Sequence, residues 1–166
     1  MASTLKTKVD EVKRLVDQLY EWYVPPFTIS RVVVPYDRIK SIVKELGDKY
    51  NLRGWFPLDG TYYTTDRDTF KKVVEWDWSD TRKYIVDTFD CDKFAMYFKA
   101  RIAIDFGINA IGVILDYSAG HAYNLVILYE NGRYNYYLYE PQNDNIFTID
   151  MRDRDLYKME FWYLIM

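Results

Sequence analysis

The chain contains a single cysteine, Cys91, and a single histidine, His121. A thiol becomes an effective nucleophile when a nearby base removes its proton, and an imidazole base needs an acceptor that fixes its tautomer. The segment Glu-Pro-Gln-Asn-Asp at 140–144 offers carboxylate and amide groups for this purpose. These residue types predict a site in which Cys91 is the nucleophile, His121 the general base and acid, and Glu140 the group that orients the imidazole.

The elements that must position these residues are one helix followed by strands. Apolar residues at 94, 95, 98, 102 and 106 repeat at helical spacing up to Gly107, so Cys91 falls in the first turn of the helix. The helix dipole and the backbone N–H groups there favour the thiolate over the thiol. Strands are predicted at 109–117, 121–130, 134–140, 146–149 and 156–165.

A hairpin sets the register of the predicted site. Asn131-Gly132 is a strong turn signal between two strands, so residues whose numbers sum to about 263 face each other. His121 then lies opposite roughly position 142, and Glu140 and Gln142 share its face because side chains alternate along a strand. An oxygen at this place accepts the imidazole proton and leaves the second ring nitrogen directed to Cys91.

The first part of the chain has a helical pattern. Apolar spacing predicts an amphipathic helix from a cap at Ser3 or Thr4 to about Tyr23, a helix at 37–47, and a third helix that begins at Asp66. A short strand is predicted at 32–34 and a loop at 51–63. The expectation is one domain over 1–166, with a mainly helical part at 1–80 and a helix with an antiparallel sheet at 84–166, of the α+β class.

Composition limits the partners and the compartment. A chain of 166 residues that is 49% hydrophobic can bury one core, which supports a single domain. A net charge of −3 without a basic run gives no reason to expect nucleic acid. No apolar run approaches the ~20 residues that span a bilayer, and no signal peptide is evident, so the protein is expected to be soluble and cytoplasmic without a membrane partner.

The stretch at 84–144 resembles the papain-like and transglutaminase-like cysteine enzymes. The shared features are the Cys-Asp-x-Phe-Ala helix start at 91–95, the Gly-Ile-x-Ala segment at 107–110, the His-Ala-aromatic-Asn strand start at 121–124, and an acidic residue after the hairpin. Within that superfamily the approach to Cys91 and the Glu-Pro-Gln ending look most like the papain-like C-terminal domain of the mushroom agglutinin family. The resemblance implies a papain-like or transglutaminase-like fold.

The resemblance also implies an activity. Members of the family use Cys, His and Glu and can depend on calcium, which implies a thiol protease or amidase acting on a peptide or protein, with hydrolysis as the expected outcome and no cofactor required for the chemistry. Papain-type enzymes carry a glutamine shortly before the cysteine as an oxyanion donor, and this chain lacks it. The candidates for the missing donor or for supporting roles are Trp76, Trp78, Tyr84 and Gln142.

Several alternatives stay open at this point. The same scaffold can serve as a non-catalytic binding module, and an amine can replace water as the acceptor, as in transglutaminases. Zinc held by Cys91, His121 and Glu140 is disfavoured because a further thiol or imidazole is missing. Asp150, Asp153 and Asp155 lack the glycine and the final glutamate of a calcium-binding EF-hand loop, so a solvated turn is the better interpretation there.

Overall fold

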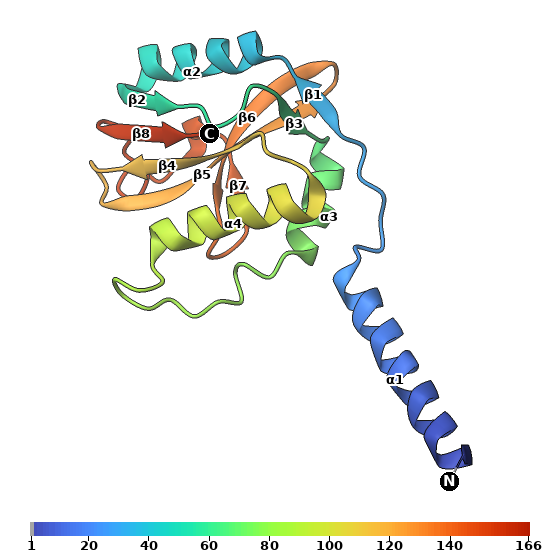
Figure 1. Ribbon diagram of the computed structural model, residues 1–166. Helices are drawn as coiled ribbons and strands as arrows, with labels where there is room; N and C mark the ends of the chain where they lie inside the picture. Colours follow the sequence, from blue (N-terminus) through green and yellow to red (C-terminus); the bar gives the residue numbers. More distant parts are fainter. Residues whose placement is uncertain (1) are drawn as a thin grey trace.

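The computed structural model describes residues 2–166, with the side chains at 2–4 and 20–23 outside the description. A six-stranded sheet forms the centre, with α2 on one face and α4 on the other (Figure 1). The helices are α1 (Ala2–Tyr23), α2 (Tyr36–Tyr50), α3 (Arg67–Trp76) and α4 (Cys91–Phe106), with a short 3-10 turn at Ile149–Met151. The strands are β1 (Val32–Val34), β2 (Leu52–Phe56), β3 (Tyr62–Thr64), β4 (Ile111–Asp116), β5 (His121–Glu130), β6 (Arg133–Glu140), β7 (Asn145–Phe147) and β8 (Trp162–Ile165).

The sheet has the strand order β2-β8-β4-β5-β6-β7, and β1 pairs with β3 in a separate two-stranded ladder. The predicted hairpin is confirmed: β5 and β6 are antiparallel with Asn124 opposite Tyr139, and Asn131 and Gly132 adopt φ values of 51° and 78° at the turn. Two consecutive residues with positive φ are what a tight two-residue hairpin requires. This turn therefore sets which residues of β6 lie beside the start of β5.

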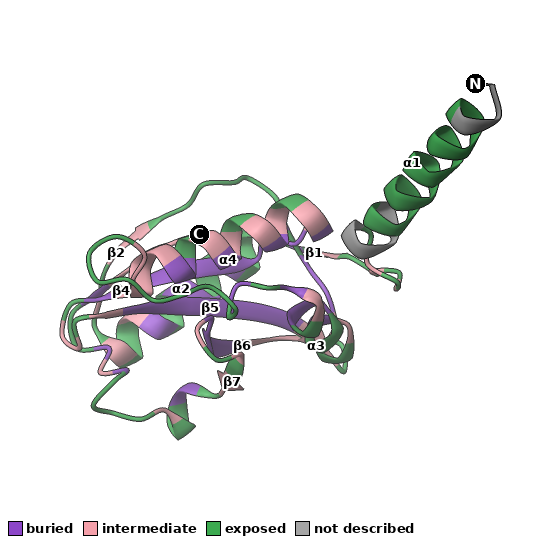
Figure 2. Cartoon of the chain, turned by 90° about the horizontal axis from the view of Figure 1, so that it is seen from below, coloured by how far each residue is buried: buried purple, intermediate pink, exposed green. Residues whose placement is uncertain are grey.

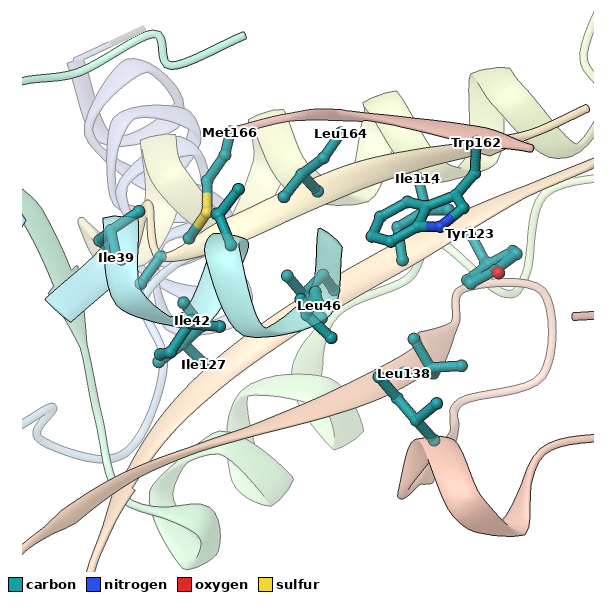
Figure 3. Packing of buried hydrophobic residues seen from close by; sticks show 14 of the residues in the cluster. Ile39, Ile42, Leu46, Ile114, Tyr123, Ile127, Leu138, Trp162, Leu164 and Met166 are labelled. Atoms are coloured by element: carbon teal, nitrogen blue, oxygen red, sulfur yellow. The ribbon is translucent and has the colours of Figure 1, made fainter. Parts of the chain in front are cut away.

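Each face of the sheet carries its own apolar core. The first core packs the buried face of α2, with Ile39, Ile42 and Leu46, against sheet residues that include Ile114 and Trp162 (Figure 3). The second core packs α3 and α4 against the opposite face. Because both faces are covered, β5 is buried along most of its length rather than on alternate residues.

The expected antiparallel sheet was wrong in one respect. Strand β2 pairs with β8 in a parallel arrangement, with Trp55 beside Leu164, so the sheet is mixed. The prediction of a loop over 51–63 was also wrong, because β2 lies inside that stretch and β3 begins at Tyr62. Both strands are short, and their pairing partners are distant in the sequence, so local periodicity carries little signal for them.

The end of α2 also differs from the prediction. Apolar spacing suggested a stop at Gly47, yet the helix continues to Tyr50 and ends where Asn51 adopts φ 64° and donates its backbone N–H to the Gly47 carbonyl at 3.1 Å. Asparagine tolerates the left-handed conformation of a helix C-cap almost as well as glycine. The helix can therefore include Gly47 and end at Asn51.

Helix α3 begins at the predicted cap. The Asp66 carboxylate accepts the Thr69 backbone N–H at 2.8 Å and the Thr69 hydroxyl at 2.7 Å. Burial raises the pKa of Asp66, but these hydrogen bonds outweigh it, and the net pKa lies below the usual 3.8. The carboxylate thus stabilises the folded state in its ionised form.

Asp66→Ala is expected to reduce the free energy of unfolding by about 1 kcal/mol at pH 7, the typical cost of losing a helix N-cap. Asp66→Asn is the control, since it keeps an acceptor without the charge. Because the folded-state pKa is lowered, the contribution of the charge is present above pH 3.8 and is lost as the pH falls through the folded-state value. Urea unfolding at pH 7 and pH 3 measures this, and equal stability of wild type and Asp66→Ala at pH 7 would contradict the cap.

Helix α1 extends away from the rest of the molecule (Figure 1). The predicted helix up to Tyr23 is confirmed, whereas the proposed caps at Ser3 and Thr4 involve side chains outside the described ones. The described part of α1 is exposed all round (Figure 2). Within residues 2–166, no helix combines the length and the apolar character needed to cross a membrane.

Candidate functional site

Cys91 is the first residue of α4, as the sequence predicted. The helix begins with the Phe94 backbone N–H donating to the Asp90 carbonyl at 3.0 Å, and the Phe89 ring lies against the Phe94 ring with centroids 4.7 Å apart. Cys91 is partly buried and is a free thiol. Its position in the first turn leaves backbone N–H groups and the positive end of the helix dipole beside the sulfur.

His121 lies at the first position of β5, directly opposite Asp116 of β4. A pocket of about 360 Å³ separates this strand start from the first turn of α4. We call it the thiol pocket; its lining residues are Asp90, Cys91, Asp92, Lys93, Met96, Leu115, Asp116, Tyr117, Gly120, His121 and Ala122. The fold thus brings the only thiol and the only imidazole of the chain to one depression.

Glu140 holds one side of the imidazole. His121 Nε2 and Glu140 Oε2 are 2.7 Å apart, and the Glu140 residue is only 3% exposed. This contact occupies Nε2 and leaves Nδ1 as the ring nitrogen available to a partner in the pocket. The structure therefore brings together Cys91, His121 and Glu140, the three residues that the sequence selected.

Two further side chains position Glu140. The Gln142 side-chain amide donates to Glu140 Oε1 at 3.1 Å, and the Tyr157 hydroxyl donates to Glu140 Oε2 at 3.1 Å. Burial, together with the negative charge of Glu140, raises the pKa of Tyr157, so the phenol stays protonated as a donor. Gln142 thus supports the carboxylate from beside it instead of facing the thiol.

Asp116 is a buried carboxylate that shapes the wall of the pocket. It accepts the Met159 backbone N–H at 2.8 Å, the Tyr123 hydroxyl at 3.1 Å and the Ala119 backbone N–H at 3.3 Å, and the Ser118 hydroxyl also donates to it. These bonds fix the β4–β5 turn that precedes His121. We assign Asp116 a structural role, because its oxygens are used by the fold.

The aromatic residues considered as oxyanion donors separate into two groups. Trp76 and Trp78 stack on each other, and Trp76 packs edge-on against Phe106 at the far end of α4 with centroids 5.4 Å apart. Fifteen residues of helix, about 22 Å, separate Phe106 from Cys91, so neither indole lies near the thiol. Tyr84 instead stacks on Phe94, in the first turn of α4, with ring centroids 6.4 Å apart, so it lies beside the start of this helix.

Metal binding receives no geometric support in residues 2–166. No group of three or more His, Cys, Asp and Glu side chains is arranged there to hold an ion. Asp150 instead accepts the Tyr50 hydroxyl at 3.2 Å, and Asp153 accepts the backbone N–H of Asp155 at 2.9 Å. These carboxylates are used by hydrogen bonds within the chain and do not fit a calcium ion, and calcium dependence stays a prediction.

Comparison with known protein families assigns the chain to one of them. The model for the ricin-type beta-trefoil lectin C-terminal domain matches residues 3–157, which is most of the chain. The chain belongs to this lectin C-terminal domain family. A comparison with curated proteins finds no match.

Solved structures share the fold. A structure described as a PSL1a–E64 complex matches with a TM-score of 0.58 and 19% identity, over 81% of this chain and 50% of the other. Polyporus squamosus lectin bound to the human-type influenza-binding epitope Neu5Aca2-6Galb1-4GlcNAc matches with a TM-score of 0.55 and 22% identity, over 76% of this chain and 48% of the other. The chain thus spans about half the length of the structures that it matches.

These matches correct the family expected from the sequence. The assignment to papain-like or transglutaminase-like cysteine enzymes was wrong, because the matching family is that of a lectin C-terminal domain and the named neighbour is a lectin. The papain-like fold class was wrong for the same reason. The description as a hydrolase or thiol protease with a catalytic triad was wrong as well. The resemblance rested on short motifs within 84–144. A cysteine in the first turn of a helix and a histidine at a strand start are local arrangements that more than one family can contain.

Sequence reasoning missed Tyr157. It lies in the irregular segment between the 3-10 turn and β8, and its ring packs 5.5 Å from the His121 ring and 4.8 Å from the Tyr123 ring. The chain has 17 tyrosines, so residue type alone does not single it out. Only the return of the C-terminal segment across the sheet brings its hydroxyl to Glu140.

Tyr157→Phe is expected to slow alkylation of Cys91 about 3- to 10-fold, because a hydrogen bond to a charged group contributes about 1.5–3 kcal/mol and part of this orients Glu140 toward His121. Tyr139→Phe is the matched control, since it loses a hydroxyl that donates to Asp144 and lies in the second core instead. Both variants should lose similar stability in urea, and only Tyr157→Phe should change the alkylation rate. Equal rates in the two variants would show that Tyr157 has only a structural role.

Proposed function

We propose that this lectin C-terminal domain is a ligand-binding module and that its ligand occupies the thiol pocket. The observation that carries the proposal is the convergence of Cys91 and His121, the only residues of their types, on one pocket of about 360 Å³. The titles of the structural neighbours add support, since one names a complex with E64 and the other a lectin with a bound sugar epitope. The domain would then act within a glycan-recognising protein.

The charges of the thiol pocket restrict the ligand. Its lining includes the carboxylates of Asp90, Asp92 and Asp116 and one ammonium group, that of Lys93. Lys93 is already paired, with its Nζ 3.1 Å from Asp90 Oδ1 and 3.0 Å from Asp92 Oδ1. A carboxylate on the ligand would meet like charge, so we infer a neutral or cationic ligand such as a peptide segment. A sialylated epitope would suit another surface better.

Titration of the 166-residue chain with three probes tests this binding. The probes are the sialylated trisaccharide and two amidated peptides of equal length, one rich in lysine and one rich in glutamate. The lysine peptide should shift the backbone NMR signals of Gly120 and Ala122, the glutamate peptide should bind about 10-fold more weakly at low salt, and the trisaccharide should leave these two signals unchanged. Shifts confined to residues outside the thiol pocket would overturn the assignment of the site.

A second function, acyl transfer through Cys91, is favoured by a specific contact. The 2.7 Å contact between His121 and Glu140 holds the imidazole with Nδ1 free for the thiol, and a pure binding site has no need of this arrangement. The proposed substrate is an amide or peptide, and the acceptor is an amine. Cys91 is the nucleophile, His121 the base and acid, and Glu140 the group that positions His121.

The proposed chemistry proceeds in two balanced steps. His121 Nδ1 takes the proton of Cys91, the sulfur attacks the amide carbonyl, and the C–N bond breaks as the imidazolium returns the proton to the leaving amine. The resulting thioester is then attacked by a second amine, which forms a new amide bond and regenerates the thiol. The Cys91 backbone N–H and the Tyr84 hydroxyl are the proposed donors to the oxyanion.

Mass spectrometry separates the two functions. During incubation of the full chain with a peptide amide, acyl transfer predicts release of the amine and a transient mass increase on the protein, both lost in Cys91→Ser and in His121→Ala. Ligand binding without chemistry predicts unchanged NMR titrations in Cys91→Ser and no covalent adduct with the wild type. An adduct that persists in Cys91→Ser would contradict the assignment of the nucleophile.

A further inference from the structure

Helix α1 carries an apolar stripe that the rest of the molecule leaves exposed. Its described apolar side chains are between 45% and 68% exposed; they are Leu5, Val9, Val12, Leu15, Val16 and Leu19. Figures 1 and 2 show the helix projecting from the body of the protein. Amphipathic helices gain most of their stability by burying the apolar face against a partner.

The spacing of the stripe is that of a coiled coil. The positions 5, 9, 12, 16 and 19 alternate by four and three residues, which is the a/d pattern of a heptad repeat. Val9 and Val16 fall at a positions, and Leu5, Val12 and Leu19 fall at d positions. Branched valine at a with leucine at d favours pairing of two helices.

The residues beside the stripe indicate the charge of the partner. Lys6 and Lys13 occupy e positions, and Lys8 occupies a g position. In a parallel pair of two α1 helices, Lys8 of one copy would face Lys13 of the other, and antiparallel pairing would also place lysines together. Like charges at these positions oppose pairing with a second copy, while carboxylates on a partner would complement them.

We propose that α1 is a docking element for a helix of another protein that carries an apolar a/d stripe flanked by acidic residues. The body of the domain anchors this element, because the Phe27 ring, a few residues after α1, stacks on the Phe106 ring of α4 with centroids 6.3 Å apart. The partner would therefore be held close to the α3–α4 face of the domain.

A membrane surface fits α1 less well. Helices that lie on membranes carry lysine and arginine over the polar face, where they meet anionic lipids. The polar face of α1 instead mixes charges, with Asp10, Glu11 and Asp17 beside Arg14. Acidic residues on this face oppose binding to anionic lipids.

The test uses the full 166-residue chain and two synthetic peptides of three heptads. Both peptides carry valine at a and leucine at d; one has glutamate at e and g, and the other has lysine there. Isothermal titration calorimetry should give 1:1 binding of the glutamate peptide, at least about 10-fold tighter than the lysine peptide and weakened by salt. Val12→Asp should abolish this binding, and Asp17→Asn, on the opposite face, should leave it unchanged.

A charge reversal keeps the proposal falsifiable if Val12→Asp unfolds the helix. The triple variant Lys6→Glu, Lys8→Glu, Lys13→Glu should prefer the lysine peptide. Equal binding of both peptides, or of neither, would overturn the proposal. If the chain dimerises without a peptide and Val12→Asp removes the dimer, the stripe binds a second copy of the chain. If the chain sediments with phosphatidylserine vesicles and binds neither peptide, the stripe binds a membrane. Either result rejects the proposed partner.

Discussion

His121→Ala is expected to slow alkylation of Cys91 by iodoacetamide about 10- to 100-fold at pH 7, because the thiolate is the reactive form and the imidazole is the group that accepts the thiol proton. The two residues line the same pocket, and the 2.7 Å contact with Glu140 holds the ring in place. The chain has no other histidine and no other cysteine, so the labelled residue and the removed base are both unambiguous. Quenching the alkylation at a series of times and measuring the labelled fraction by mass spectrometry gives the alkylation rate.

The control for this effect is Tyr117→Phe, a conservative change in an exposed residue that lines the same pocket. Its alkylation rate should match that of the wild type. Glu140→Gln should fall between wild type and His121→Ala, since an amide oxygen can still accept from the ring but carries no charge to stabilise an imidazolium. A rate that is the same in wild type and His121→Ala would leave Cys91 as an ordinary thiol and reject acyl transfer.

Trp162→Ala is expected to lower the free energy of unfolding by about 3–5 kcal/mol, the cost of removing a large aromatic side chain from a packed core. Trp162 is 0% exposed and lies between β8 and α2 in the first core (Figure 3). Its indole N–H also donates to the Tyr50 carbonyl at 2.6 Å, which ties the C-terminal end of α2 to the sheet. Urea unfolding followed by circular dichroism gives the change in stability.

Two variants separate the contributions of Trp162. Trp162→Phe keeps much of the ring and loses the indole donor, so about 1–2 kcal/mol is expected from the unpaired Tyr50 carbonyl and the smaller side chain. Trp78→Ala, at a tryptophan that is 56% exposed, should cost about 1 kcal/mol or less. A loss in Trp162→Ala no larger than that in Trp78→Ala would show that the first core does not depend on this side chain.

Family membership came from comparison with known proteins. The motifs around Cys91 and His121 suggested a cysteine enzyme, whereas the match over residues 3–157 assigns the chain to a lectin C-terminal domain family. Short motifs report local geometry, such as a thiol at a helix start, and this geometry does not by itself identify a family or a function. The motifs nevertheless selected residues that lie together in the structure: Cys91 and His121 line one pocket, and Glu140 contacts His121.

Elements whose causes are local could be predicted from the amino-acid sequence. Apolar periodicity and Gly107 predicted the helix that begins at Cys91, and the Asn131-Gly132 turn predicted the register that places Glu140 and Gln142 beside His121. Helix periodicity and hairpin turns depend on residues close together in the chain, so they can be read without knowledge of the fold.

Contacts between distant segments could not be predicted in this way, because they depend on how the whole chain folds. The parallel pairing of β2 with β8 and the approach of Tyr157 to Glu140 join residues far apart in the chain, and no local pattern encodes such a pairing. The thiol pocket likewise exists only because α4 and β5 pack side by side. Burial and chain topology, which act over the whole molecule, select these contacts from many that the residue types alone would allow.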